Sequence, residues 1–162
     1  MALVVANNLG AAFGSTAQLI GADASTASEI GLETIRGPRE GNGPLAAILD
    51  AMESSKSTFI AFAPNDTPFF STENFAALRT KIEGSESDAV VVIDDSSSPR
   101  THWLLSVWLR EPCLSTLRNE YDLGVRSVHG AVTNLHISTV ECDEACVRNI
   151  NTVSDLPNQG TI

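Results

Sequence analysis

The chain has 162 residues, of which 43% are hydrophobic, and its 20 acidic against 10 basic side chains give a formal net charge of -10. This length fits one globular domain that can bury a core without disulfides or a structural metal. The negative charge disfavours nucleic acid and anionic membrane surfaces as partners, because both need a basic footprint on the protein.

The first third of the chain predicts few regular elements. A β-branched run predicts a strand over residues 2–6, and residues 9–31 show only weak helical character with no clear core face. A short strand is expected over residues 32–35. Residues 37–43 (GPREGNG) form a loop rich in helix and strand breakers. Pro44 then starts a helix, because the N–H that proline lacks would have no partner at the first helical position.

The remainder alternates between apolar strands and helices. Strands are predicted over residues 57–63, 88–93, 103–108 and 135–140, and helices over residues 74–82, 112–121, 125–132 and from Thr152. Ser71 or Thr72 can cap the first of these helices. This order indicates an α/β fold with a largely parallel sheet, in one domain over residues 1–162.

The cysteines and the hydropathy pattern suggest a compartment. Cys113, Cys142 and Cys146 make an odd number, which suits a reducing environment better than a disulfide framework. No apolar run is long enough to cross a bilayer, and the first residues lack the basic segment of a signal peptide. We therefore expect a cytoplasmic protein with no membrane partner.

Asp66 is the first candidate for chemistry. It follows directly after the buried strand at 57–63, and in open α/β sheets ligands bind beyond the carboxyl ends of the strands. Magnesium is commonly held by one or two carboxylates together with phosphates and water, so one aspartate is enough. The alternative is an ordinary turn aspartate before a proline.

Two further segments could bind phosphate. The glycines of the loop at 37–43 let the backbone approach a ligand at a helix start, and Arg36 and Arg39 add positive charge. Arg126, followed by Ser127, could grip a phosphate through its guanidinium. The alternative for the loop is a plain strand-to-helix connection, and the alternative for Arg126 is an arginine that contacts only solvent.

The common nucleotide fingerprints are absent. Neither the dinucleotide-binding nor the P-loop glycine pattern occurs, and residues 10–15 match a glycine-rich loop only weakly. No lysine or arginine precedes Arg36, which argues against a triphosphate cradle near the start. The three histidines are scattered, and we interpret them as packed or surface residues.

Four short motifs in order resemble those of the molybdenum cofactor guanylyltransferases, the MobA-like nucleotidyltransferases. They are GPLAA at 43–47, NDTP at 65–68, GVRSV at 124–128, and NINT at 149–152 with Asp155 and Leu156. The family pattern is G-P-L-A-G, C-D-x-P, G-x-R-x-V and N-x-N-T-x-x-D-L. The resemblance covers residues 32–156, and residues 4–7 resemble the family's upstream strand and asparagine.

The resemblance implies a Rossmann-like, three-layer nucleotidyltransferase fold and a Mg²⁺-dependent reaction. In that reaction GMP passes from GTP to molybdopterin and pyrophosphate is released. Asp66 would be the catalytic metal ligand. The implied nucleotide-binding residues are Asn7, Gly43, Pro44 and Asp66. The implied molybdopterin-binding residues are Arg126, Ser127, Asn149 and Asn151.

The chain also departs from the family pattern. The family opens with a strand and a loop of the form L-A-G-G-x-S-x-R-M-G, followed by a lysine, which would have to precede Met1 here. Gly37 stands near the place of a family aspartate, Asn65 replaces the cysteine of C-D-x-P, and Ala47 replaces the last glycine of G-P-L-A-G.

Three functional hypotheses follow. The chain is a guanylyltransferase that begins internally, a catalytically inactive relative that binds a nucleotide or pterin, or a nucleotidyltransferase for another acceptor such as a sugar phosphate. We expect the chain alone to have very low activity. The family's first strand is central in its sheet, so its loss would leave unpaired backbone groups unless residues 2–6 or a second chain closed the gap. We therefore expect self-association.

Overall fold

The structure is a computed structural model that describes residues 1–150. Its helices are α1 (Ala2–Phe13), α2 (Ala24–Glu29), α3 (Pro44–Ser54), α4 (Thr72–Glu83), α5 (Arg110–Asp122) and α6 (Val128–Ala131), with a short 3-10 helix η1 at Glu144–Val147. Its strands are β1 (Gln18–Ile20), β2 (Glu33–Ile35), β3 (Phe59–Phe62), β4 (Ala89–Asp94), β5 (Thr101–Leu109) and β6 (Ile137–Cys142). The helix expected from Thr152 lies outside the described residues.

The main sheet has the strand order β3-β5-β4-β6. Strands β3 and β4 both pair antiparallel with β5, and β6 pairs parallel with β4. Three of the four strands therefore run in one direction, in agreement with the largely parallel sheet predicted. A turn joins β4 to β5 without a helix, as the predicted strands at 88–93 and 103–108 implied, whereas the antiparallel direction of β5 was not predicted.

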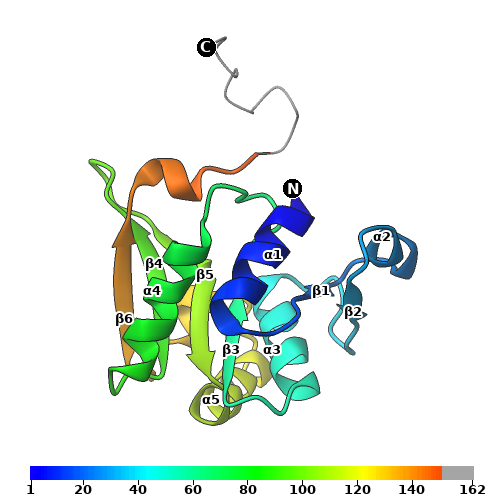
Figure 1. Ribbon diagram of the computed structural model, residues 1–162. Helices are drawn as coiled ribbons and strands as arrows, with labels where there is room; N and C mark the ends of the chain where they lie inside the picture. Colours follow the sequence, from blue (N-terminus) through cyan, green and yellow to red (C-terminus); the bar gives the residue numbers. More distant parts are fainter. Residues whose placement is uncertain (151–162) are drawn as a thin grey trace.

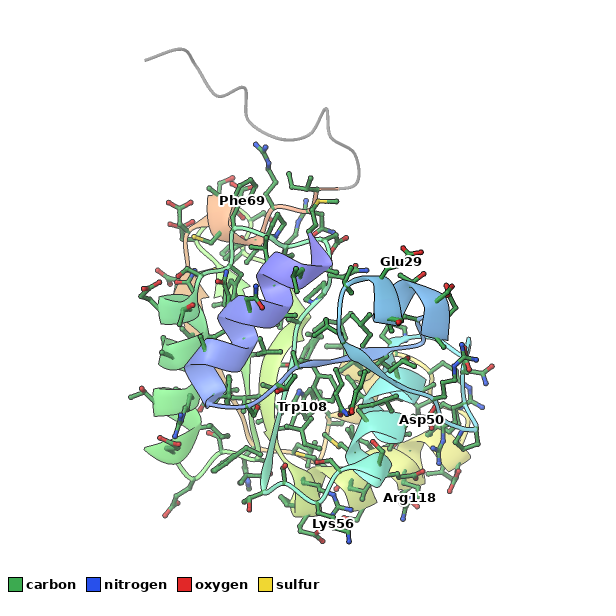
Figure 2. The ribbon with its side chains drawn as sticks, turned by 45° about the vertical axis from the view of Figure 1, so that its right-hand side comes forward. Glu29, Asp50, Lys56, Phe69, Trp108 and Arg118 are labelled. Carbon is green, nitrogen blue, oxygen red and sulfur yellow. The ribbon has the colours of Figure 1, made fainter. Side chains whose placement is uncertain are left out.

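Helices cover both faces of this sheet and make three layers (Figure 1). Helices α1 and α4 pack on one face around a core of apolar side chains that includes Phe70, Phe75, Leu78, Val90 and Val107. Helices α3, α5 and α6 pack on the other face, with a core that includes Leu45, Leu49, Met52, Trp108 and Leu117. Trp108 is fully buried, and Figure 2 shows it between the sheet and the helices.

The strand predicted over residues 2–6 is wrong, because these residues begin helix α1. Val5 and Ala12 are buried and Leu9 packs with them, which is the spacing of one helical face. The helix ends at Gly14, whose φ of 65° is left-handed and whose N–H bonds to the carbonyl oxygen of Gly10. The helical period over twelve residues thus overrides the β-propensity of the short valine run.

Residues 15–35 form a small strand–helix–strand unit outside the main sheet. Strands β1 and β2 pair in parallel, which confirms the short strand predicted over residues 32–35 and adds β1, which the sequence did not predict. Helix α2 joins them and starts at Asp23, whose carboxylate accepts hydrogen bonds from the backbone N–H of Thr26 and the hydroxyls of Ser25 and Thr26. These bonds, that from Ser25 above all, lower the pKa of Asp23.

Two predicted helix starts are confirmed. Helix α3 begins at Pro44, and Ser71 caps α4 by accepting a hydrogen bond from the N–H of Asn74. Helix α5 begins at Arg110, two residues before the predicted start. Within residues 1–150, none of the helices combines the length and the apolar character needed to span a bilayer.

Candidate functional site

The carboxyl ends of the parallel strands define the candidate site. Strands β3, β4 and β6 end at one edge of the sheet, and hydrogen bonds tie together the segments that follow them. The N–H of Asp95 donates to the carbonyl of Cys142 (3.0 Å), and the N–H of Glu144 donates to the Asp95 carboxylate (2.9 Å). The N–H of Ile150 donates to the carbonyl of Asp66 (2.7 Å). The loop after β3 and the segment at 149–150 therefore lie together.

Asp66 has the most unusual environment at this edge. It lies in the turn after β3, which the fully buried Thr67 holds by donating from its hydroxyl to the carbonyl of Pro64 (3.0 Å). The Oδ1 atom of Asp66 is buried and has no hydrogen-bond partner in the described structure. An unpaired buried carboxylate oxygen is costly, so a cation or donor supplied by a ligand would satisfy it. Asp66 therefore does not simply point into bulk solvent.

The donor set around Asp66 suits magnesium better than a metal that needs a protein cage. Among residues 1–150, no group of three or more His, Cys, Asp or Glu side chains is placed to hold a metal ion. A metal at Asp66 would thus have at most two such side chains from residues 1–150 and would take its other ligands from substrate and water. Magnesium accepts such a site, so the residue fits the ion.

The loop at 37–43 lies beside the ends of β1 and β2. Gly43 has a φ of 89° and forms the N-cap of α3, and Pro44 takes the first helical turn. A cavity of about 50 Å³ opens there, lined by Ile20, Gly21, Ile35, Gly37, Arg39, Glu40, Gly41, Gly43, Ala47 and Asp50. The loop thus places Gly43 at a hollow beside the ends of β1 and β2.

Arg39 does not add free positive charge to this loop, contrary to the expectation from sequence. Its guanidinium bonds to the carboxylates of Asp50 (2.7 Å) and Glu53 (2.9 Å) on α3. These bonds, with Glu53 as the largest cause, raise the pKa of Arg39 above its ordinary value. Glu53 also accepts from Arg118 of α5 (2.9 Å), and the pKa of Glu53 is lowered, chiefly by Arg39. Figure 2 labels Asp50 and Arg118, both at the lower right of the view.

Asp50 is a residue that sequence analysis missed. It is 5% exposed on the apolar face of α3, between the buried Leu49 and Ala51. Its carboxylate lies against Gly37, where a Cβ atom would come within 2.1 Å of the Asp50 Cγ atom. The sequence did carry a signal for this residue, namely an aspartate inside an otherwise apolar helical stretch. A buried carboxylate is rare in proteins unless it has a partner.

Arg126 and Ser127 have local partners. The Arg126 guanidinium donates to the carbonyls of Tyr121 (2.6 Å) and Val125 (2.9 Å) and lies 4.1 Å from the centre of the Tyr121 ring. Ser127 caps α6, because its hydroxyl oxygen accepts a hydrogen bond from the N–H of Gly130 (3.1 Å). Both residues are exposed, so a ligand can reach them.

The three asparagines named from the resemblance have different positions. Asn149 is exposed and precedes Ile150, which is fully buried and bonded to the Asp66 turn. Asn151 lies outside the described residues. Asn7 lies on α1 with its side chain exposed, so it does not follow a strand as expected. Its neighbour Asn8 donates to the carbonyl of Phe70 (3.1 Å).

A second carboxylate at this edge was also missed. Asp94 ends β4, is 3% exposed, and contacts the Nε2 atom of His102 at 2.8 Å. It also accepts from Ser96 and from the N–H of Arg100. The hydrogen bond from Ser96, followed by that with His102, lowers the pKa of Asp94. These bonds stabilise the turn between β4 and β5. They also give His102 a carboxylate partner, which the positions of the histidines in the sequence did not indicate.

Four of the proposed site residues fall into two groups, while Asn7 lies on α1 and Arg126 and Ser127 lie at the start of α6. Gly43 and Pro44 follow the β1–β2 unit, whereas Asp66 and Asn149 belong to the main sheet's edge. The two sheets are separate, and a further cavity of about 180 Å³ lies between β1 and β3. Asp66 lines neither this cavity nor the smaller one.

Comparison with known proteins identifies the family. The family described as "MobA-like NTP transferase domain" matches residues 1–136. The chain belongs to this family. It is also 35% identical over 116 residues to the molybdenum cofactor guanylyltransferase of Haemophilus influenzae, a match that covers 70% of this chain and 58% of that protein. A probable molybdenum cofactor guanylyltransferase of Bacillus licheniformis is 26% identical over 124 residues, which cover 74% of this chain and 61% of the relative.

Solved structures of nucleotidyltransferases share the fold. The molybdopterin-guanine dinucleotide biosynthesis protein A of Archaeoglobus fulgidus superimposes with a TM-score of 0.63 at 20% identity, over 84% of this chain and 72% of that one. The 2-C-methyl-D-erythritol 4-phosphate cytidylyltransferase of Thermus thermophilus gives 0.70 at 13% identity, over 94% and 84%. These likenesses confirm the Rossmann-like nucleotidyltransferase fold predicted from sequence. The chain spans about three fifths of the length of the curated relatives named above.

Proposed function

We propose that this chain is the nucleotidyltransferase domain of a molybdenum cofactor guanylyltransferase, which transfers GMP from GTP to molybdopterin. The observation that carries the proposal is the buried, unpartnered Oδ1 atom of Asp66 at the carboxyl end of β3. Family membership and the 35% identity to the Haemophilus influenzae enzyme support the choice of reaction.

The proposed reaction exchanges one phosphoryl bond for another. A phosphate oxygen of molybdopterin attacks the α-phosphorus of GTP, the bond from that phosphorus to the bridging oxygen breaks, and pyrophosphate leaves with the electron pair. Two anions must meet in this step, and a bound Mg²⁺ would supply the neutralising charge. Asp66 is the residue that would hold the ion, and its place in a fixed turn keeps the carboxylate oriented before substrates arrive.

The other site residues receive roles from their positions. We assign Gly43 and Pro44 to the nucleotide, because the start of α3 presents backbone N–H groups that have no partner within the helix. We assign Arg126 and Ser127 to molybdopterin, together with Asn149 and, from sequence, Asn151. An amide side chain can donate and accept hydrogen bonds at once, which suits the edge of a pterin ring.

A catalytically weak or inactive relative is the second candidate, and one observation favours it. The only basic residues before Gly43 are Arg36 and Arg39, and Arg39 is already bound to two carboxylates. A GTP triphosphate would therefore find little cationic help in this part of the chain. We propose that the chain alone transfers GMP slowly. The three cysteines are free thiols, which supports a cytoplasmic location for the reaction.

The test measures pyrophosphate release from GTP and molybdopterin in the presence of Mg²⁺. We expect slow release that Asp66→Ala abolishes, whereas Asn65→Ala retains it, since Asn65 is an exposed neighbour of Asp66. Faster pyrophosphate release with CTP than with GTP would identify a cytidylyltransferase. Calorimetry with Mg²⁺ and GTP detects a binding-only relative. Release that is unchanged in Asp66→Ala would overturn the assignment of Asp66.

A further inference from the structure

Strand β5 contains a bulge near the candidate site. Its pairing with β4 passes from Ser106 directly to His102, and its pairing with β3 ends at Ser106, so residues 103–105 stand outside both ladders. The hydroxyl of Ser106 donates to the carbonyl of Trp103 (2.9 Å) and closes the bulge. Because β5 runs opposite to β3 and β4, its first residues lie at the edge where those strands end. Bulges turn side chains in new directions and are common beside active sites.

The bulge changes the face of the sheet on which Trp103 lies. In a regular strand, successive side chains point to opposite faces, and residues 104–109 follow this rule. Leu104 and Trp108 pack with the core under α3, α5 and α6, whereas Leu105 packs with the core under α1 and α4. Continued alternation would place Trp103 on the α1 and α4 face. Instead, Trp103 packs on the same face as its neighbour Leu104, so the bulge directs the indole toward α3, α5 and α6.

On this face the Trp103 indole meets helix α6. Trp103 is only partly buried, whereas Trp108 further along the same strand is fully buried. The centre of the Trp103 ring system lies 5.7 Å from that of the exposed His129 ring on α6, and the two ring planes meet at 66°. This edge-to-face contact is a favoured geometry for aromatic pairs, and it orients the indole. Helix α6 directly follows Arg126 and Ser127, which we assign to molybdopterin.

The bulge and the Asp66 turn lie at the same edge of the sheet. Strand β3 leaves β5 after the pair Phe62–Ser106, and the chain continues to Asp66 on the side of Ser106 where the bulge begins. Asp66 offers an anionic oxygen, and Arg126 offers a cation and hydrogen-bond donors. Molybdopterin combines a phosphate with a flat pterin ring, and a flat ring is bound best by an aromatic surface. The Trp103 indole can supply that surface.

We infer that Trp103, oriented by His129, is the surface on which the pterin ring of the acceptor stacks. The inference rests on the proposed function, which supplies the acceptor. Position favours the pterin over the guanine base, because Gly43 and Pro44 follow the separate β1–β2 unit, whereas His129 follows the residues assigned to molybdopterin. A sugar phosphate has no aromatic face to stack. Trp103 would therefore select a pterin acceptor over a sugar phosphate.

The test uses the indole N–H signals of the ¹⁵N-labelled full chain. Trp103 and Trp108 are its two tryptophans, so two signals are expected, and the one missing in Trp103→Phe belongs to Trp103. The probe is 6-hydroxymethylpterin monophosphate, added without GTP or Mg²⁺. Its ring current should shift the Trp103 signal, whereas the buried Trp108 signal should stay in place. Glycerol 3-phosphate, which carries a phosphate but no ring, should leave both signals unchanged.

Substitutions in the bulge separate loss of the ring from disturbance of the strand. Titration of the probe's own fluorescence measures its dissociation constant in each variant. Trp103→Leu should raise this constant about fivefold or more, because stacking is lost, and Trp103→Phe should retain most of the affinity. Leu104→Ala is the matched control, since Leu104 lies in the same bulge and on the same face but carries no ring. It should bind the probe as the original chain does.

Four results would overturn the inference. They are an unmoved Trp103 signal at saturating probe, equal affinity in Trp103→Leu and the original chain, an equal loss of affinity in Leu104→Ala, and a Trp103 signal that GTP shifts but the pterin probe does not. None of these measurements depends on GMP transfer. A shifted Trp103 signal without pyrophosphate release would sustain the pterin surface and refute the proposed reaction. Pyrophosphate release with an unmoved signal would do the opposite.

Discussion

Removal of the Asp66 carboxylate should stabilise the fold in the absence of a ligand. The Oδ1 atom of Asp66 is buried without a partner, so the folded state carries a desolvation cost that the unfolded chain lacks. Asp66→Ala deletes the carboxylate and leaves the turn's other bonds in place, namely the Thr67 hydroxyl to Pro64 and the Ile150 N–H to the carbonyl of residue 66. Asp66→Ala should therefore raise the free energy of unfolding of the ligand-free protein.

The expected size of this effect follows from the cost of one unsatisfied buried group. That cost is about 1–3 kcal/mol, and the loss of packing around the side chain reduces the net gain to about 1–2 kcal/mol. For a domain of this length each kcal/mol moves the melting temperature by about 2–4 °C, so Asp66→Ala should melt about 2–8 °C higher.

Urea denaturation of the original chain and of Asp66→Ala, with and without magnesium chloride, measures the effect. Magnesium should stabilise the original chain and leave the variant unchanged, because only the former offers the carboxylate. Asn65→Ala is the control, since this exposed neighbour should change stability by less than about 0.5 kcal/mol. A variant that is less stable than the original chain without magnesium would refute the reasoning, since the carboxylate would then have a stabilising partner.

Two further predictions concern the loop at 37–43 and its anchors. Gly37→Ala should destabilise the protein by about 1–3 kcal/mol, because its Cβ would overlap the Asp50 carboxylate. In a double-mutant cycle, this cost should be smaller when Asp50→Ala is also present. Additive effects of the two substitutions would contradict the contact. Glu53→Gln should cost about 1 kcal/mol near neutral pH, measured by urea denaturation. The pKa of Glu53 in the folded protein lies below the ordinary 4.5, so the stabilisation by ionised Glu53 is present above pH 4.5 and is lost as the pH falls through the lowered pKa. A difference in stability between the original chain and Glu53→Gln that persists in acid would contradict this role.

Much of the fold could be predicted from local sequence patterns. The apolar run before Asp66, the valine run of β4 and the proline at the start of α3 each carry their signal within a few residues, and each element formed where expected. The short motifs also predicted the family, because four of them occur in order at compatible spacings. Patterns of this kind depend on burial of one face or of a whole strand, and neighbouring residues encode that burial.

Local patterns failed where packing decides. Residues 2–6 have the β-branched composition of a strand, yet they form a helix because Val5, Leu9 and Ala12 pack together against the main sheet and α4. The antiparallel direction of β5 was not predicted either, since it depends on pairing with β3, which is distant in sequence, as well as with β4.

By itself the sequence determined that a carboxylate follows strand β3 and that a glycine–proline pair starts α3. Only the tertiary structure decided how these groups are used. It left one oxygen of Asp66 buried without a partner, bound Arg39 to Asp50 and Glu53, and opened a gap between β1 and β3. Each of these outcomes depends on groups far apart in the chain, whose mutual distances no local pattern specifies.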